Sequence, residues 1–185
     1  MWVYGCGDAI VKCVAETGEA HGPLAALRRR ILEREARILR DVADRVPACV
    51  PAWKQFDGTR LFIARLTGPD LSCLRGELGG NALLFRDVRL AVQRFHSAGY
   101  AHGELRLGNL VLHGGAVRIV DLATATSSSH PLYRLALCGD RLALLWMKRH
   151  LFALPFDEAD LLLRQRYRRL WPWFERLAPN FVPFG

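Results

Sequence analysis

One short segment in the second half of the chain combines a loop, a hairpin and three polar side chains at a spacing that few folds accommodate. Glu104 is followed after four residues by Asn109, and the apolar runs 110–112 and 116–120 come next. Two apolar runs joined by a pair of glycines predict a β-hairpin, and the second run leads directly into Asp121. The sequence therefore predicts a compact unit that carries two carboxylates and one amide close together.

These three side chains are the types that phosphoryl transfer requires. One carboxylate must orient the hydroxyl group that accepts the phosphate, and oxygen ligands must hold Mg²⁺ on the phosphates. We interpret Glu104 as the orienting carboxylate, and Asn109 and Asp121 as the metal ligands. Asn109 could instead be a turn residue of the hairpin and Asp121 a cap at the strand end, but their joint spacing favours the metal site.

The rest of the chain predicts a small sheet followed by a mainly helical part. Runs rich in β-branched and aromatic residues predict strands at 2–4, 9–14, 51–56 and 60–66. Helical spacing of apolar residues predicts helices at 24–46, 81–98, 132–152 and 157–171, with Pro172 stopping or kinking the last helix and coil after it. A turn is expected at 5–8 and a loop at 17–23. This order of elements indicates an α+β fold.

Two of the predicted helices have clear apolar faces. The apolar face of the first helix, with Glu35 beside it, consists of Leu24, Leu27, Ile31, Ile38 and Val42. The residues of the second helix that are predicted to face inward are Leu83, Leu84, Val88, Ala91, Val92 and Phe95. We expect the first helix to pack along one side only, because arginines and a glutamate occupy the rest of its surface.

The polar segment resembles the catalytic loop of the eukaryotic-type protein kinase superfamily in its H-G-D-x-x-x-x-N variant, and residues 117–123 resemble the strand that ends in D-F-G. The H-G form is typical of small atypical kinases, namely RIO-type kinases, the kinase subunit of the KEOPS tRNA-modifying complex and lipopolysaccharide-core sugar kinases. The resemblance implies a two-lobed kinase-like fold. Residues 1–67 would form a small β-sheet lobe with one long helix, 68–71 the hinge exit, and 72–185 a reduced, mainly helical lobe.

The resemblance also implies roles for residues elsewhere in the chain, with ATP and Mg²⁺ as cofactors. Lys12 resembles the lysine that binds the α- and β-phosphates, and Glu35 resembles the helix glutamate that pairs with it. Lys12 alone could be a surface lysine at a strand edge, but the position of Glu35 favours the ion pair. Backbone groups near Ala64 and Leu66 would hold adenine, and Asp140 would brace the backbone of the catalytic loop.

Three departures from the family pattern leave two functions open. Glu104 replaces the catalytic aspartate, Ala123 replaces the glycine of D-F-G, and only four residues precede Gly5, which leaves little room for a glycine-rich strand pair over the phosphates. Gly5 and Gly7 form either a shortened version of that pair or an ordinary turn. The first function is a phosphotransferase that moves the ATP γ-phosphate to a hydroxyl on a protein or a lipopolysaccharide sugar. The alternative is a pseudokinase that binds nucleotide as a regulatory or scaffold subunit, for example of an RNA-modifying complex.

The net charge of +8 favours anionic partners, namely a nucleotide, a lipid-linked sugar, an acidic protein or tRNA. The basic, aromatic stretch 164–173 could contact RNA or membrane, but its leucine spacing favours an ordinary amphipathic helix. Arg106 would contact either phosphate or solvent. The five cysteines are scattered, and the sequence shows no signal peptide and no apolar run long enough to span a bilayer. These features predict a cytoplasmic protein with reduced thiols, and the alternative location is the surface of the inner membrane.

Overall fold

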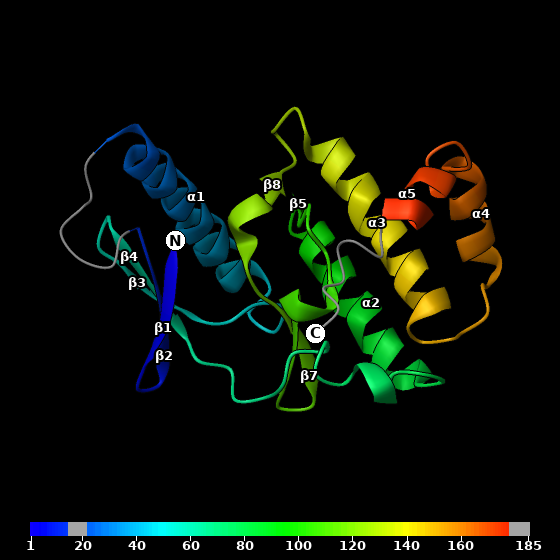
Figure 1. Ribbon diagram of the computed structural model, residues 1–185. Coiled ribbons are helices and arrows are strands. Elements are labelled where there is room, and N and C mark those ends of the chain that lie inside the picture. Colours follow the sequence, from blue (N-terminus) through cyan, green and yellow to red (C-terminus); the bar gives the residue numbers. More distant parts are fainter. Residues whose placement is uncertain (15–21, 178–185) are drawn as a thin grey trace.

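The chain has an α+β fold, as the order of elements predicted. The computed structural model describes residues 1–14 and 22–177, so most of the loop predicted at 17–23 and the end of the predicted C-terminal coil lie outside the described residues. A small antiparallel sheet and the long first helix occupy one side of the molecule, and four further helices with a hairpin occupy the other (Figure 1).

The sheet has four antiparallel strands in the order β1-β2-β4-β3. Its strands are β1 (Trp2–Cys6), β2 (Ala9–Cys13), β3 (Trp53–Phe56) and β4 (Arg60–Ala64). The turn predicted at 5–8 is shorter than expected, because pairing continues to Cys6↔Ala9 and leaves only Gly7 and Asp8 in the loop. Gly7 has a φ of 58°, which glycine adopts without strain. Gly5 therefore lies in β1, and Gly7 lies in the two-residue turn of the hairpin.

Helix α1 (Pro23–Arg45) begins on a proline and packs against β3, β4 and the turn after Asp121. The residues that it buries are Leu32, Glu35, Ala36, Ile38, Leu39 and Val42. The predicted apolar face is wrong in its first turns, since Leu24 and Leu27 are 61% and 55% exposed. Full burial along the helix begins at Leu32, and in the first turn Ala25 is partly buried against the core.

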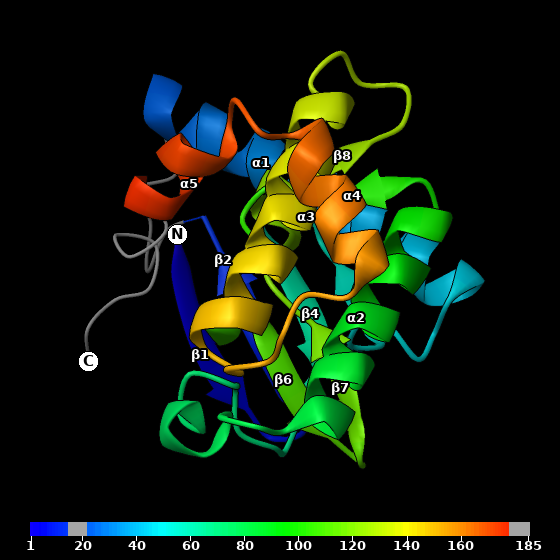
Figure 2. The same cartoon turned by 90° about the vertical axis from the view of Figure 1, so that its right-hand side faces the viewer.

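The second half of the chain packs helices around two short β-ladders (Figure 2). The helices are α2 (Ala82–Ser97), α3 (Tyr133–His150), α4 (Glu158–Arg166) and α5 (Trp171–Leu177). The predicted hairpin is present as β6 (Leu110–His113) and β7 (Ala116–Ile119), and β5 (Tyr100–Ala101) pairs with β8 (Thr126–Ser127). Three 3₁₀ turns, η1 (Arg75–Glu77), η2 (Leu107–Asn109) and η3 (Leu122–Thr124), complete the described elements. Within the described ranges, no helix has the length and apolarity needed to cross a membrane.

Helix α2 shows a second error in the predicted apolar faces. Asn81 caps the helix by accepting a hydrogen bond from Leu84 N at 3.0 Å. Leu83 was predicted to face inward, but its side chain is 68% exposed. Phe85 is buried two residues further on, which places Leu83 about 200° around the helix from it. Leu83 therefore lies on the solvent side.

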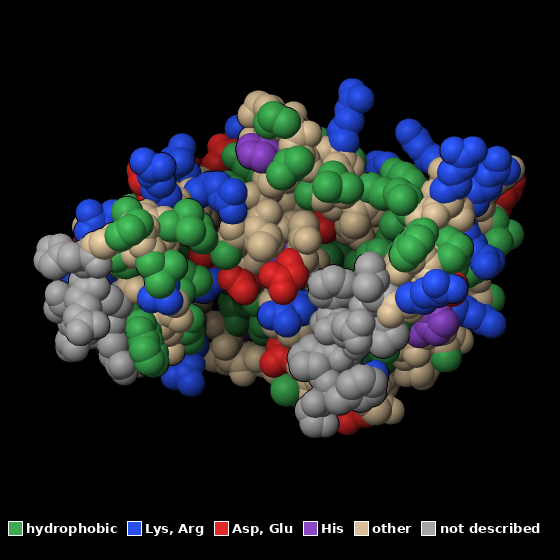
Figure 3. Space-filling model, turned by 45° about the horizontal axis from the view of Figure 1, so that its top comes forward, with side chains coloured by type: hydrophobic (Ala, Val, Ile, Leu, Met, Phe, Trp, Pro, Cys, Tyr) green, Lys and Arg blue, Asp and Glu red, His purple; other side chains and the backbone are tan. Residues whose placement is uncertain are grey.

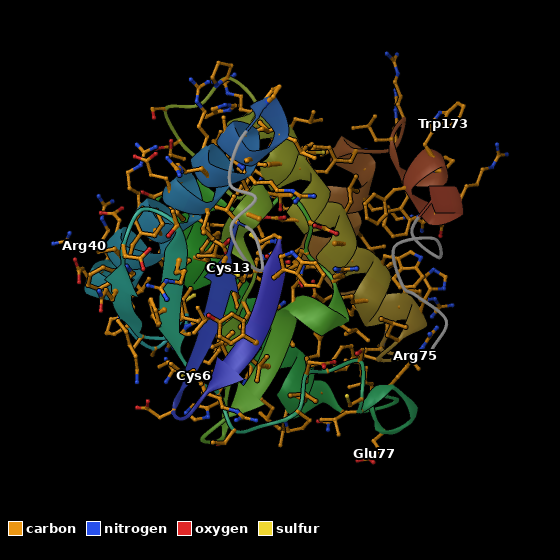
Figure 4. All side chains as sticks on the ribbon, turned by 60° about the vertical axis from the view of Figure 1, so that its left-hand side comes forward. Cys6, Cys13, Arg40, Arg75, Glu77 and Trp173 are labelled. Carbon is orange, nitrogen blue, oxygen red and sulfur yellow. The ribbon has the colours of Figure 1, made fainter. Side chains whose placement is uncertain are left out.

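The helix predicted at 157–171 ends five residues early, and a separate helix begins at its predicted last residue. Helix α4 ends at Arg166 and α5 begins at Trp171, so Pro172 lies in the first turn of a new helix, where a missing N–H does no harm. The coil predicted after Trp171 is therefore wrong up to Leu177. Trp171 is buried, whereas Trp173 is 65% exposed and projects outward from α5 (Figure 4). The two exposed leucines of α4, Leu161 and Leu162, also depart from the expected amphipathic pattern.

The segment at 68–71 joins the sheet to the helical part by pairing with the hairpin. Leu71 N donates to Leu110 O at 2.8 Å, and Leu112 N donates to Pro69 O at 3.0 Å. Gly68 lies so close to the hairpin that a Cβ atom there would be 1.5 Å from Leu112 O. The position therefore accepts only glycine unless the backbone moves.

We expect Gly68→Ala to lower the free energy of unfolding by about 3 kcal/mol, because the new methyl group meets a backbone carbonyl that cannot rotate away. Urea unfolding followed by far-UV circular dichroism measures the loss. Gly76→Ala is the matched control, since a Cβ at Gly76 meets nothing within 4 Å. Equal unfolding midpoints for the two variants would contradict the prediction.

Candidate functional site

The side chain of Lys12 joins two carboxylates that come from distant parts of the chain. Its Nζ lies 2.6 Å from Glu35 Oε1 and 2.7 Å from Asp121 Oδ1. Strand β2 supplies the lysine, α1 supplies the glutamate, and the aspartate follows β7. The predicted ion pair between Lys12 and Glu35 is confirmed, and both residues are buried. The surface is hollowed between the sheet side and the helical side, with acidic and basic side chains at the edge of the hollow (Figure 3).

The two carboxylates have different electrostatic environments. Burial raises the pKa of Glu35 above its usual value, and the nearby Lys12 charge offsets this only in part. Burial also opposes ionisation of Asp121, but the charge of Lys12 and its hydrogen bond outweigh this and lower the pKa of Asp121. Burial disfavours the Lys12 charge as well, yet the two carboxylates together raise its pKa. Asp121, whose side chain is 36% exposed, is thus the carboxylate that stays charged near solvent.

Helix α1 also holds the backbone that follows Asp121. Asp121 has a left-handed backbone, with φ 59° and ψ 71°. Glu35 Oε1 accepts a hydrogen bond from Leu122 N at 3.2 Å, and Arg34 donates from Nη2 to the carbonyl oxygen of Ala123. The role of Arg34 was not predicted, because its sequence context indicated only a solvated basic helix face.

Asp140 organises the backbone at the start of the predicted catalytic loop. Its carboxylate accepts hydrogen bonds from His102 N at 2.7 Å, Gly103 N at 2.9 Å and His96 Nε2 at 2.9 Å. The predicted bracing role of Asp140 is therefore confirmed. His102 is 1% exposed and donates from Nε2 to Val120 O at 3.0 Å, which agrees with the structural role expected for this histidine.

The other predicted residues of the catalytic loop, Glu104, Arg106 and Asn109, follow the backbone that Asp140 holds. Asn109 donates from Nδ2 to the carbonyl oxygen of Glu104 at 2.9 Å, which leaves its Oδ1 as the atom able to bind a cation. The side chain of Glu104 is 38% exposed, and its Oε1 lies 3.6 Å from Arg106 Nε. Burial opposes the ionisation of Asp121, and the charges of Lys12, His102 and Arg106 together lower its pKa. Arg106 therefore lies beside Glu104, with its own side chain 36% exposed.

The two residues predicted to hold adenine differ in what their backbones can offer. Ala64 N already donates to Ala52 O at 2.9 Å, so this N–H is not available to a ligand. Strand β4 ends at Ala64 and not at Leu66 as predicted. In the part of the chain that the structure describes, Leu66 forms no backbone hydrogen bond, so its N–H and C=O are both open.

This geometry, and not a known relative, is the basis for assigning a function. The sequence matches no protein-family model and no curated protein. Among the described residues, no group of three or more His, Cys, Asp or Glu is arranged to hold a metal ion. Mg²⁺ on a nucleotide does not need such a group, because phosphate oxygens and water fill most of its coordination positions. The oxygens of Asn109 and Asp121 fit that requirement in number and chemical type.

A small, mainly apolar cavity of about 110 Å³ adjoins the loop on the side of Glu104. Its lining includes Glu104, Arg106, Ala143, Trp146, Met147 and Phe174. Sequence reasoning missed this cavity because Phe174 belongs to α5, a helix that was predicted as coil. The cavity provides space for part of another molecule directly beside the Glu104 side chain.

Proposed function

We propose that the protein is an ATP- and Mg²⁺-dependent phosphotransferase of the small atypical kinase type, which moves the γ-phosphate to a hydroxyl on a protein or a lipopolysaccharide sugar. The observation that carries the proposal is the position of Lys12 Nζ between Glu35 and Asp121, at 2.6 and 2.7 Å. In this proposal residues 1–67 form the small lobe of a kinase-like fold, 68–71 the hinge exit, and 72–185 the helical lobe. The confirmed brace from Asp140 supports the same assignment.

Each residue has one role in the proposed reaction. Lys12, held by Glu35, binds the phosphates, and the Ala64 carbonyl with the Leu66 backbone holds adenine. Asn109 Oδ1 and Asp121 hold Mg²⁺, and bound MgATP supplies the phosphoryl group for transfer. Glu104 orients the acceptor hydroxyl beside the apolar cavity. The net charge of +8 supports an anionic acceptor or partner, such as a lipid-linked sugar, an acidic protein or tRNA, in the cytoplasm or at the inner membrane surface.

Two observations favour the second candidate, a pseudokinase that binds nucleotide as a regulatory or scaffold subunit. Glu104 has one methylene more than the family's aspartate, and its carboxylate lies near Arg106, which competes for it. The hairpin between β1 and β2 is closed by only Gly7 and Asp8, so it offers no long glycine-rich loop over the phosphates.

Substitutions at Glu104 separate the two candidates, with ADP release from MgATP as the measurement. For an enzyme, we expect Glu104→Gln to reduce turnover to background, because an amide cannot accept the hydroxyl proton. Glu104→Asp should raise turnover by up to about a hundredfold, since positioning limits phosphoryl transfer. A thermal shift with MgATP in all three proteins shows that binding is intact. Equal turnover in wild type and Glu104→Gln would reject the enzyme assignment, and binding with background turnover throughout would favour the pseudokinase.

A further inference from the structure

A second cavity lies between α1 and the segment that follows Asp121. It has a volume of about 400 Å³, and its lining includes Arg34, Arg37, Tyr100, Thr126, Ser127 and His130. Lys12, Glu104 and Asp121 do not line it. The cavity is therefore separate from the proposed nucleotide site.

The charge of this cavity is positive. Two guanidinium groups, from Arg34 and Arg37, line it, and Asp41 is its one acidic lining residue. Both oxygens of Asp41 have partners, because Tyr100 OH donates to Oδ2 at 2.6 Å and Arg45 lies 3.0 Å from Oδ1. Burial and the contact with Asp41 raise the pKa of Tyr100 to about 12, so the phenol remains a neutral donor. The cavity thus has no free negative charge among its described lining residues.

Two donors on residues of the cavity lining are buried and have no acceptor among the described residues. Thr126 is 8% exposed and its Oγ1 has no hydrogen-bond partner, and the buried Nε of Arg34 has none either. The Nδ1 atom of His130 accepts from Leu132 N at 3.1 Å, which leaves Nε2 as a donor. Buried polar groups without partners are rare and costly, so a group that brings several acceptors would satisfy them.

We propose that this cavity binds the phosphate group of a small phosphomonoester. A phosphate offers several acceptor oxygens, and guanidinium groups bind it through paired, charge-assisted hydrogen bonds. Arg34 and Arg37 supply the charge, while Thr126 and His130 supply neutral donors. A volume of about 400 Å³ is within the range of small-molecule sites and leaves room for the organic part of the ligand.

The test is calorimetric titration of the nucleotide-free protein with glycerol 2-phosphate, inorganic phosphate and glycerol at constant ionic strength. We expect glycerol 2-phosphate to bind at least as tightly as inorganic phosphate, and glycerol not to bind. Arg37→Gln and Thr126→Val should each weaken binding about tenfold. Arg29→Gln is the matched control, because it removes the same charge from an exposed position of α1 outside the cavity lining.

Three results would overturn the proposal. The first is no binding of glycerol 2-phosphate to the wild-type protein. The second is equal affinity in wild type, Arg37→Gln and Thr126→Val, which would place the ligand elsewhere, for example at Lys12. The third is an equal loss of binding in Arg29→Gln and Arg37→Gln, which would indicate diffuse attraction to a basic surface. Thr126→Val is expected to fold, because it replaces an unpaired buried hydroxyl with a methyl group of similar shape.

Discussion

Asp121→Ala is expected to reduce Mg²⁺-dependent ATP turnover by about a thousandfold or more. The carboxylate of Asp121 lies 2.7 Å from Lys12 Nζ, is partly exposed, and keeps its charge because its pKa is lowered. Its removal would take away the only charged ligand proposed for Mg²⁺ and leave the metal with Asn109 alone. Lys12 would remain paired with Glu35, so we expect the protein to stay folded. Steady-state ADP release at saturating MgATP measures the effect.

Two further measurements make this prediction specific to the metal. The thermal shift produced by ATP should depend on Mg²⁺ in the wild-type protein and lose that dependence in Asp121→Ala. Asp44→Ala is the control, because Asp44 is an exposed aspartate on α1 far along the helix from Glu35. If Asp121→Ala turns over ATP as fast as Asp44→Ala, the activity does not come from this site.

The parts of the fold that could be predicted from the sequence are those determined by local pattern. The hairpin of β6 and β7 follows from two apolar runs joined by glycines, and it lies within a residue of the predicted ends. Strand β2 and helix α1 each have a strong local signal. The contact of Lys12 with Glu35 needed more than pattern, since it required the resemblance to the kinase superfamily to connect residues 23 positions apart.

The errors occur where tertiary packing decides the outcome. Helical spacing groups Leu24 and Leu27 with the buried residues of α1, but spacing does not show where the covering elements end. The break between α4 and α5 has a similar cause. Buried Lys148 contacts Asp157 and Asp160 at the start of α4, and Trp171 packs edge-on against Phe156 with ring centroids 6.2 Å apart. These long-range contacts favour two short helices over a continuous one.

The unpredicted parts of the site involve backbone partners. Arg34 contacts the carbonyl oxygen of Ala123, which is 89 residues away in the sequence. Every residue has a carbonyl group, so no side-chain pattern indicates which one an arginine will bind. The same reasoning applies to the unpaired hydroxyl of Thr126, because its burial depends on how β8 packs against β5 and α3.

Asp140→Ala is expected to lower the free energy of unfolding by about 3–5 kcal/mol. The carboxylate is 1% exposed and accepts from three donors, two of which are the backbone N–H groups of His102 and Gly103. Without it, these donors lose their acceptor, and a buried donor without a partner, such as His102 N, costs about 1–3 kcal/mol. The loss is a large part of the total stability of a domain of this size. The same change releases the backbone that positions Glu104, so turnover should fall as well.

Urea unfolding measures how much the Asp140 carboxylate contributes to stability. The variants are Asp140→Ala and Asp140→Asn, and Asp44→Ala is the matched surface control. Asp140→Asn keeps one acceptor oxygen but turns an N–H₂ group toward the remaining donors, so we expect about half of the loss. It also provides a folded variant if Asp140→Ala proves too unstable to purify. A loss below about 1 kcal/mol for Asp140→Ala would mean that the loop backbone does not depend on this carboxylate. The turnover of Asp140→Asn then shows whether the brace acts on Glu104 or only on stability, because an intact loop would leave it at the wild-type rate.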